Sequence, residues 1–289
     1  MERVRCVTDD EVDLIGFLYD NSNESNWNLI FPGVDGNILT NEFIDVLGKQ
    51  ISSAGFKFLC CHHRGSFQII SSNPLDSSRK GKTVGSAFEN FDDCIYDFDA
   101  WINFAITHGA KKINLIGHSH GCNKLIYYMS SQNKFKKYIN SIVLLSPLDL
   151  KTRMSNRREI NELFDRANNL KSLNDLNSFI CCGFFYKNFN SFYDMMNNQN
   201  LDNFPMMNCE NNDFSQFNSI DKNIYIIYGE EEKKYIKHIE EKRKYLNKNI
   251  KEIAILNNTG HIYQGKEQEL TSLILKYIKG DDVYEKSIY

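Results

Sequence analysis

The sequence lacks the features that mark several large classes of protein. No apolar run approaches the roughly 18 residues that a membrane-spanning helix needs. The first ten residues are too polar for a secretory signal peptide. The formal net charge is only −3, and no basic stripe with interleaved aromatic residues is present. We therefore expect a cytoplasmic protein with no membrane insertion and no nucleic-acid partner.

The eight cysteines form no C-x-x-C pair and show no zinc-ligand spacing. Their number is even, but without a secretory signal no disulfide framework is expected. Two adjacent pairs, Cys60–Cys61 and Cys181–Cys182, lie in apolar runs, where buried free thiols are expected. The neighbouring pair His62–His63 raises a metal site as an alternative, but no second ligand cluster has suitable spacing. The sequence thus predicts no metal.

The chain has 289 residues, of which 42% are hydrophobic and 25% charged, enough for one large α/β domain. Short runs typical of strands alternate with helical patterns, which predicts an α/β fold with a mostly parallel eight-stranded sheet flanked by helices. The expected strands are Arg3–Thr8, Asp13–Tyr19, Trp27–Phe31, Phe56–Cys61, Ile113–Ile116, Ser141–Leu145, Ile224–Tyr228 and Ile253–Leu256.

Apolar residues three and four positions apart predict helices between these strands. One such stripe joins Phe88, Phe91, Ile95, Phe98 and Ile102; another joins Phe43, Leu47 and Ile51; a third joins Leu270, Leu273, Ile274 and Tyr277. The segment from Glu232 to Leu246 is dense in lysine and glutamate, which indicates a helix with a solvated charged face.

One long stretch, from about residue 150 to 220, shows no parallel strand. Long insertions in compact domains are usually functional, so we predict an α/β core of residues 1–150 and 221–289, interrupted by residues 151–220, which form a helical cap over the site. A structural elaboration without a role in substrate choice is the alternative. The cap is rich in aromatic residues, which favours an apolar or aromatic substrate unless these residues are simply core: Phe184, Phe185, Tyr186, Phe189, Phe192 and Tyr193.

The sharpest local motif is Gly117-His118-Ser119-His120-Gly121, which follows an apolar strand and precedes a helical pattern. In a G-x-S-x-G turn between strand and helix, small flanking residues allow the tight turn that exposes the serine. The helix N-terminus there favours developing negative charge. We therefore predict Ser119 as a nucleophile.

A serine hydroxyl needs a general base, and His261 stands in the loop between the last strand and the last helix. His118 and His120 lie inside the turn, where we expect them to point away from the serine. In the expected chain order of serine, acid, histidine, the acid follows Tyr228-Gly229. Glu232 is the first choice there, and the alternatives are Glu231 and Asp149.

An oxyanion intermediate needs preorganised N–H donors. The backbone of His120, directly after the nucleophile, is one candidate. The second is Val34 in the glycine-rich loop Phe31–Asn37, which follows the third strand. We expect Arg64, in the turn His62–Gly65, to bind backbone carbonyls or a carboxylate.

These motifs resemble the α/β-hydrolase superfamily over nearly the whole chain, from Val4 to Gly280. They are most similar to a bacterial and fungal group of serine hydrolases with an H-G-x-x-G-N oxyanion loop, an N-x-R-G turn, a G-H-S-x-G elbow and a downstream L-L-S-P-x-D. The corresponding stretches are Phe31–Asn37, His62–Gly65, Gly117–Gly121 and Leu144–Asp149. Pro32 stands where the group has histidine, His120 where it has a small residue or leucine, and glutamate where the acid is usually aspartate.

The resemblance implies a serine hydrolase of carboxylic esters, thioesters or amides that needs no cofactor and takes a small-molecule acyl substrate. Two alternatives remain open. The same triad could transfer the acyl group to an amine or alcohol, as an acyltransferase, cyclase or thioesterase of a biosynthetic pathway. The chain could also be a non-catalytic binding protein on a hydrolase scaffold.

Overall fold

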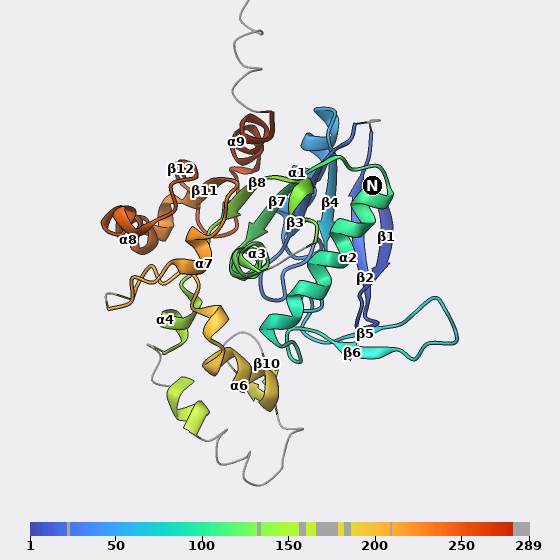
Figure 1. Cartoon of the computed structure of the whole chain (residues 1–289), viewed down its shortest axis with the longest axis horizontal. Coiled ribbons are helices and arrows are strands. Elements are labelled where there is room, and N and C mark those ends of the chain that lie inside the picture. Colours follow the sequence, from blue (N-terminus) through green and yellow to red (C-terminus); the bar gives the residue numbers. More distant parts are fainter. Residues whose placement is uncertain are drawn as a thin grey trace, which may run out of the picture.

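The computed structural model describes residues 1–21, 24–131, 134–155, 160–165, 179–181, 186–208 and 210–279. At its centre is an eight-stranded sheet in the order β1-β2-β4-β3-β7-β8-β11-β12 (Figure 1). The bounds are β1 Glu2–Val7, β2 Asp13–Tyr19, β3 Asn26–Phe31, β4 Lys57–Cys61, β7 Lys112–His118, β8 Ile139–Leu145, β11 Asn223–Gly229 and β12 Ile250–Leu256. β2 runs antiparallel to β1 and β4, and the other neighbours are parallel. The predicted mostly parallel eight-stranded sheet is confirmed.

The strand order positions the site. After β3 the chain first builds β4 on one side of it and later places β7 on the other side. Such a reversal opens a crevice at the carboxyl ends of the parallel strands, where ligands bind in open α/β sheets. The predicted nucleophile motif begins within β7, so the topology places it at this crevice.

Helices cover both faces of the sheet. On one face α1 (Glu42–Ser53) and α9 (Glu267–Lys279) form a cluster with Ile30 and Ile116. Leu29 and Leu115 join the other cluster, with α2 (Cys94–Thr107) and α3 (His120–Ser130). Successive strand side chains point to opposite faces, which explains why neighbouring residues belong to different clusters. The stripes predicted for α1 and α9 are confirmed.

The helix predicted from Phe88 begins later. Phe88 lies in a turn, Phe91–Asp93 forms a 3-10 turn (η1), and α2 starts only at Cys94. The backbone N–H groups of Ser86 and Ala87 bind the carbonyls of residues 67 and 68, which holds the segment in a loop. The preceding hairpin of β5 (Ile70–Ser72) and β6 (Lys82–Val84) was also not predicted.

The charged helix is shorter than predicted. Residues 230–232 form a 3-10 turn (η4), α8 spans Lys233–Glu241, and a second 3-10 turn (η5) covers Arg243–Tyr245. Only Tyr235 and Ile239 of α8 are buried, so the predicted solvated face is present.

The segment between β8 and β11 contributes no strand to the main sheet in its described residues. Its elements are α4 (Leu150–Ser155), a helix at 160–165, the antiparallel pair β9 (Phe179–Cys181) and β10 (Tyr186–Asn188), α6 (Phe189–Asn197), η3 (Gln199–Leu201) and α7 (Ser215–Asn218). Phe192 and Phe217 of this segment belong to the same hydrophobic cluster as the sheet. We call residues 150–220 the insertion.

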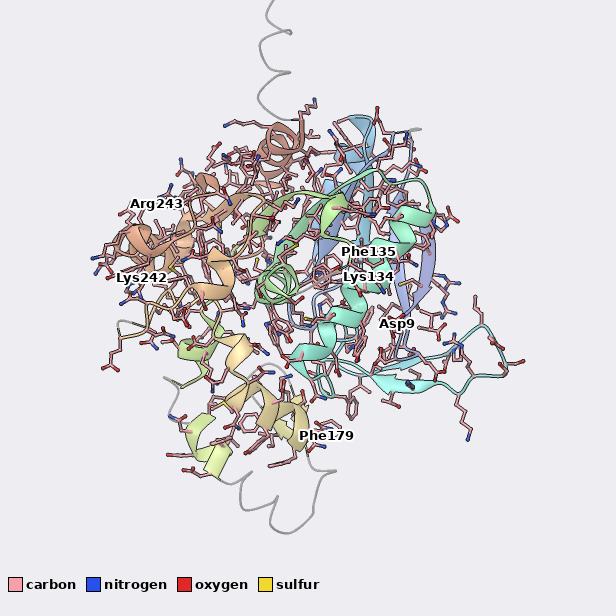
Figure 2. All side chains as sticks on the ribbon, in the orientation of Figure 1. Asp9, Lys134, Phe135, Phe179, Lys242 and Arg243 are labelled. Carbon is pink, nitrogen blue, oxygen red and sulfur yellow. The ribbon has the colours of Figure 1, made fainter. Side chains whose placement is uncertain are left out.

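Lys242, labelled in Figure 2, ties α8 to the insertion. Its buried ammonium group donates hydrogen bonds to the carbonyls of Pro205, Asn208 and Asn211 at 3.1, 2.5 and 2.6 Å. These hydrogen bonds hold the C-terminal end of α8 to the part of the insertion around residue 208.

The cysteine predictions are met in part. Cys60 and Cys61 are buried free thiols, but Cys181 is exposed because β9 lies outside the main sheet. Cys182 and Cys209 lie outside the described residues. Among the described helices, none is both long and apolar enough to span a bilayer.

Candidate active site

The turn between β7 and α3 holds Ser119 in an unusual backbone conformation, with φ 56° and ψ −125°. Positive φ is strained for a residue with a side chain, and such strain concentrates at functional sites. The flanking glycines are required, since a Cβ atom on Gly121 would lie 2.2 Å from the Phe31 carbonyl oxygen. The Ser119 N–H donates to the Leu145 carbonyl at 2.9 Å, which anchors the turn to the neighbouring strand.

A cavity of about 680 Å³ opens over this turn, within the size range of small-molecule sites. It brings together most of the residues selected from the sequence: Val34, Ser119, His120, Glu231, Glu232 and His261. The insertion contributes another part of the wall: Leu150, Arg153, Lys187, Ser191, Asp194, Met195 and Leu201.

His261 and Glu232 are in direct contact, with Nδ1 of the imidazole 2.8 Å from Oε1 of the carboxylate. The second carboxylate oxygen accepts hydrogen bonds from Ser146 Oγ at 2.5 Å and from the Gly229 N–H at 3.2 Å. Tyr263 Oη lies 2.8 Å from Ser146 Oγ. The carboxylate is buried and fixed at both oxygens, so it holds the imidazole in one orientation. The sequence reasoning missed Ser146 and Tyr263, although Ser146 stands in the Leu144–Asp149 motif.

The other two acids have different surroundings. Asp149 is buried, and its Oδ1 accepts the Thr152 N–H at 3.0 Å, which caps α4. Its Oδ2 accepts the N–H groups of Met207 and Asn208 at 2.7 and 3.2 Å. Glu231 is exposed at the rim, with its N–H bound to the Thr259 carbonyl. Of the three predicted acids, Glu232 is the one in hydrogen-bond contact with His261.

The glycine-rich loop after β3 lies directly against the serine. A Cβ atom on Gly33 would be 2.8 Å from Ser119 Cβ, so only glycine allows this approach. The following Val34 lines the cavity together with His120, the first residue of α3. N–H groups in the first turn of a helix have no carbonyl one turn earlier to bond.

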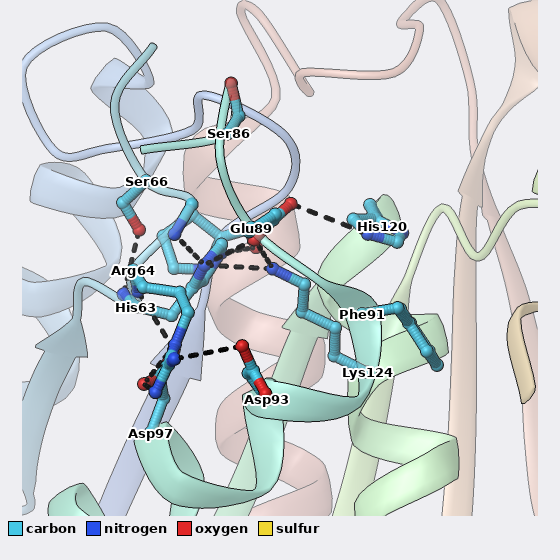
Figure 3. Close-up of polar contacts among 12 residues, drawn as sticks. His63, Arg64, Ser66, Ser86, Glu89, Phe91, Asp93, Asp97, His120 and Lys124 are labelled. Atoms are coloured by element: carbon cyan, nitrogen blue, oxygen red, sulfur yellow. Dashed lines mark hydrogen bonds and ion pairs between the residues drawn. The ribbon is translucent and has the colours of Figure 1, made fainter. Parts of the chain in front are cut away.

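The loop after β4 holds the glycine-rich loop in place by hydrogen bonds. His63 Nε2 is 3.0 Å from the Pro32 carbonyl oxygen, and the Asn37 side chain donates to the Ser66 carbonyl at 3.1 Å. Arg64 binds carboxylates, as predicted, with ion pairs to Asp97 and Asp93 that are drawn in Figure 3.

A buried charge network that the sequence did not reveal is drawn in Figure 3, and it reaches the cavity wall at Glu89. Lys124 on α3 binds Glu89 at 2.7 Å and lies 3.0 Å from His63 Nδ1. Burial alone would raise the pKa of Glu89, but the ammonium groups of Lys124 and Lys187 hold it well below its usual range. Burial and the Lys124 charge lower the pKa of His63 to about 3, so this imidazole is neutral.

The two histidines of the elbow have structural contacts. His118 Nε2 is 2.8 Å from the His261 carbonyl oxygen, and burial together with His261 lowers the pKa of His118 to about 3. His120 Nε2 lies 4.0 Å from the Glu89 carboxylate. Both residues line the cavity. Across the described part of the chain, no group of three or more His, Cys, Asp and Glu side chains is arranged to hold a metal ion.

The aromatic residues expected over the site are placed elsewhere, where the structure describes them. Phe189 and Phe192 are buried in the core cluster, and Tyr186 is exposed on β10. Phe184 and Phe185 lie outside the described residues. The wall that the insertion presents mixes polar and apolar side chains, because Phe189 and Phe192 pack in the core cluster while Ser191, Asp194 and Met195 line the cavity.

Solved structures of similar architecture span almost the whole chain. An esterase from Pyrococcus furiosus has a TM-score of 0.55 at 18% identity, covering 96% of this chain and 90% of its own. Est1E from Butyrivibrio proteoclasticus, with ferulic acid bound, has a TM-score of 0.65 at 12% identity, covering 96% of this chain and 98% of its own. A soluble variant of the Saccharomyces cerevisiae monoglyceride lipase has a TM-score of 0.61 at 15% identity, covering 94% of this chain and 93% of its own.

This likeness confirms the α/β-hydrolase fold that the motifs predicted. No curated protein matches the chain in sequence. A family model described as "Protein of unknown function (DUF1749)" matches residues 7–280. The chain therefore belongs to the DUF1749 family and has the α/β-hydrolase fold.

Proposed function

We propose that the protein is a serine hydrolase that cleaves a carboxylic ester or thioester through an acyl-enzyme on Ser119. The observation that carries this proposal is the 2.8 Å contact of Glu232 with His261, in the same cavity as a serine at φ 56°. Because Glu232 occupies Nδ1 of the imidazole, Nε2 remains to accept the serine proton.

In the proposed reaction, Ser119 Oγ attacks the acyl carbonyl while His261 Nε2 takes the hydroxyl proton. The carbonyl oxygen becomes an oxyanion, which the N–H groups of Val34 and His120 stabilise. When the carbonyl re-forms, the alcohol or thiol leaves with the proton from His261. Water, deprotonated by His261, then attacks the acyl-enzyme, and collapse of this second intermediate returns the proton to Ser119 and releases the acid.

The similar structures support the class of reaction. They include a Pyrococcus furiosus esterase and a monoglyceride lipase, which shows that hydrolysis of esters occurs on this architecture. The choice of an ester or thioester for this chain rests on its own cavity and on Ser119, His261 and Glu232.

Labelling with a fluorophosphonate probe, read by intact mass, tests the proposal. Wild type should gain one adduct, Ser119→Ala none, and His261→Ala an adduct only at a much lower rate. Ser53→Ala, on the exposed side of α1, is the matched control and should label like wild type. Unchanged labelling of Ser119→Ala, or none of folded wild type, would overturn the proposal.

A further inference from the structure

One part of the cavity wall, built from α4 of the insertion and α8 of the core, carries an unpaired positive charge. Arg153 on α4 and Tyr235 on α8 both line the cavity. Arg153 is half-buried. Across the described residues, no carboxylate lies within ion-pair distance of its guanidinium group. Removing part of a charge from water without a partner is unfavourable, so this position favours an anionic ligand.

Tyr235 adds a second polar group at the same place. Its side chain is 2% exposed, and its hydroxyl has no hydrogen-bond partner in the described structure. Burial raises the pKa of Tyr235, and the neighbouring positive charge of Arg153 opposes that rise. The two side chains are close, but their geometry does not meet the criteria of a hydrogen bond. The hydroxyl therefore remains a proton donor at neutral pH. Its ring stacks on Tyr228, with ring centroids 6.0 Å apart, which fixes its position.

The acids close to this wall are already engaged. Asp149 receives three backbone N–H groups, which cap α4 and bind the segment after Met206. Glu232 binds His261, Ser146 and Gly229. Neither carboxylate forms an ion pair with Arg153. Lys234, one residue before Tyr235, also lines the cavity, with its ammonium group 5.0 Å from the centroid of the Tyr235 ring.

We propose that Arg153 and Tyr235 form a subsite for an anionic group, a carboxylate or a phosphate, carried by the ester or thioester substrate. The planar guanidinium presents paired donors that match such a group, and the tyrosine hydroxyl donates a further hydrogen bond. The inference rests on the proposed function, because it names the substrate class of that same cavity. A subsite for an anion would make the cavity disfavour neutral lipid esters, which a purely apolar cavity accepts.

Two matched pairs of esters test the subsite in the full chain. One pair places the charge on the acyl side: 4-nitrophenyl hexanoate against the 4-nitrophenyl monoester of adipic acid. The other places it on the alcohol side: phenyl hexanoate against 4-carboxyphenyl hexanoate. The readout is the ratio of kcat/KM for the anionic ester to kcat/KM for the neutral ester. We expect a ratio above one for at least one pair in wild type.

Arg153→Gln should lower that ratio about tenfold, the size of one charge-assisted contact. Arg153→Lys should lower it less, and Tyr235→Phe should also lower it. Lys237→Gln is the matched control, since it removes a cation from the solvent side of α8, where the lysine is 73% exposed, and should leave the ratio unchanged. A ratio that is the same in wild type and Arg153→Gln for both pairs would overturn the subsite.

A binding measurement separates this inference from the proposed function. Adipate and inorganic phosphate should each be tested for a rise in the Tm of wild type that is absent in Arg153→Gln, which also distinguishes a carboxylate from a phosphate ligand. An Arg153-dependent rise with no fluorophosphonate labelling would retain the anion site and overturn only the hydrolase. Fluorophosphonate labelling without any Arg153-dependent rise in Tm or preference for the anionic ester would retain the hydrolase and overturn the anion subsite.

Discussion

His261 Nδ1 lies 2.8 Å from Glu232 Oε1 although the two residues are 29 positions apart. They stand in the loops that follow β12 and β11, two neighbouring parallel strands whose carboxyl ends meet at one edge of the sheet. Because Ser146 and Gly229 hold the other carboxylate oxygen, the acid cannot turn away without losing two further hydrogen bonds. The geometry therefore fixes a tautomer with the proton on Nδ1.

The first prediction concerns this acid. Glu232→Gln keeps the shape of the side chain but removes the charge that, in the proposed mechanism, stabilises the imidazolium, and it can present an amide N–H to Nδ1. We expect kcat for a neutral aryl ester to fall by about 10³–10⁴, as when the acid of other triads is replaced by its amide. Steady-state kinetics and the rate of fluorophosphonate labelling measure the effect.

Glu231→Gln is the matched comparison, because it makes the same chemical change one residue away at the exposed rim. It should lose far less activity. Asp149→Asn should act mainly on stability, by about 1–3 kcal/mol, since its buried carboxylate accepts three N–H groups. Losses of equal size in the first two variants would contradict the assignment of Glu232.

The second prediction concerns the loop that faces the serine. Gly33→Ala would bring a methyl group to 2.8 Å from Ser119 Cβ, so the loop must move and carry the Val34 N–H away from the proposed oxyanion position. We expect kcat to fall about 10²–10³-fold, the cost of losing one oxyanion donor. Because the change lies outside the hydrophobic clusters, urea unfolding should remain cooperative. Wild-type kcat in the variant would exclude this loop from the oxyanion site.

The third prediction concerns the buried pair Lys124 and Glu89. Removing one partner leaves an uncompensated buried charge, so Lys124→Met should reduce the free energy of unfolding by about 3–5 kcal/mol. Adding Glu89→Gln should restore a part of that loss. Urea unfolding of the two single variants and the double variant measures the coupling. Additive losses in the double variant would show that the two side chains do not stabilise each other.

The parts of the fold and site that could be predicted from sequence are those written in local patterns. The strand before Gly117, the helix after Gly121 and the loop at Gly33 each have a signature of a few adjacent residues. Contacts between distant residues have none: nothing around Glu89 indicates that its partner is Lys124, 35 positions later. The same holds for Ser146 with Glu232.

Two sequence predictions that were wrong also failed because contacts between distant residues decide the structure there. The stripe beginning at Phe88 has helical spacing, but hydrogen bonds from Ser86 and Ala87 to the preceding loop hold that segment outside the helix. The aromatic residues of the insertion pointed to an apolar cap. Which of them face the cavity depends on how α6 docks, and the docking turns Phe189 and Phe192 toward the core.

The last prediction concerns pH. Burial lowers the pKa of His62 to about 4, and burial with neighbouring charges lowers those of His63 and His118 to about 3. In the unfolded chain these imidazoles titrate near 6.5. Below that pH the unfolded state binds protons that the native state excludes, so stability is complete above about pH 6.5 and decreases as the pH falls toward 4. Each group contributes up to about 1.4 kcal/mol per pH unit.

His62→Gln isolates one of these contributions, because glutamine can still accept the Ile38 N–H that His62 Nε2 accepts at 3.1 Å. Between pH 7.5 and 5.5, the variant should lose about 1 kcal/mol less unfolding free energy than wild type. His108→Gln, at an exposed position, should follow the wild-type pH dependence. If His62→Gln does the same, His62 takes up its proton in the native state, and its burial cannot be the source of the acid sensitivity.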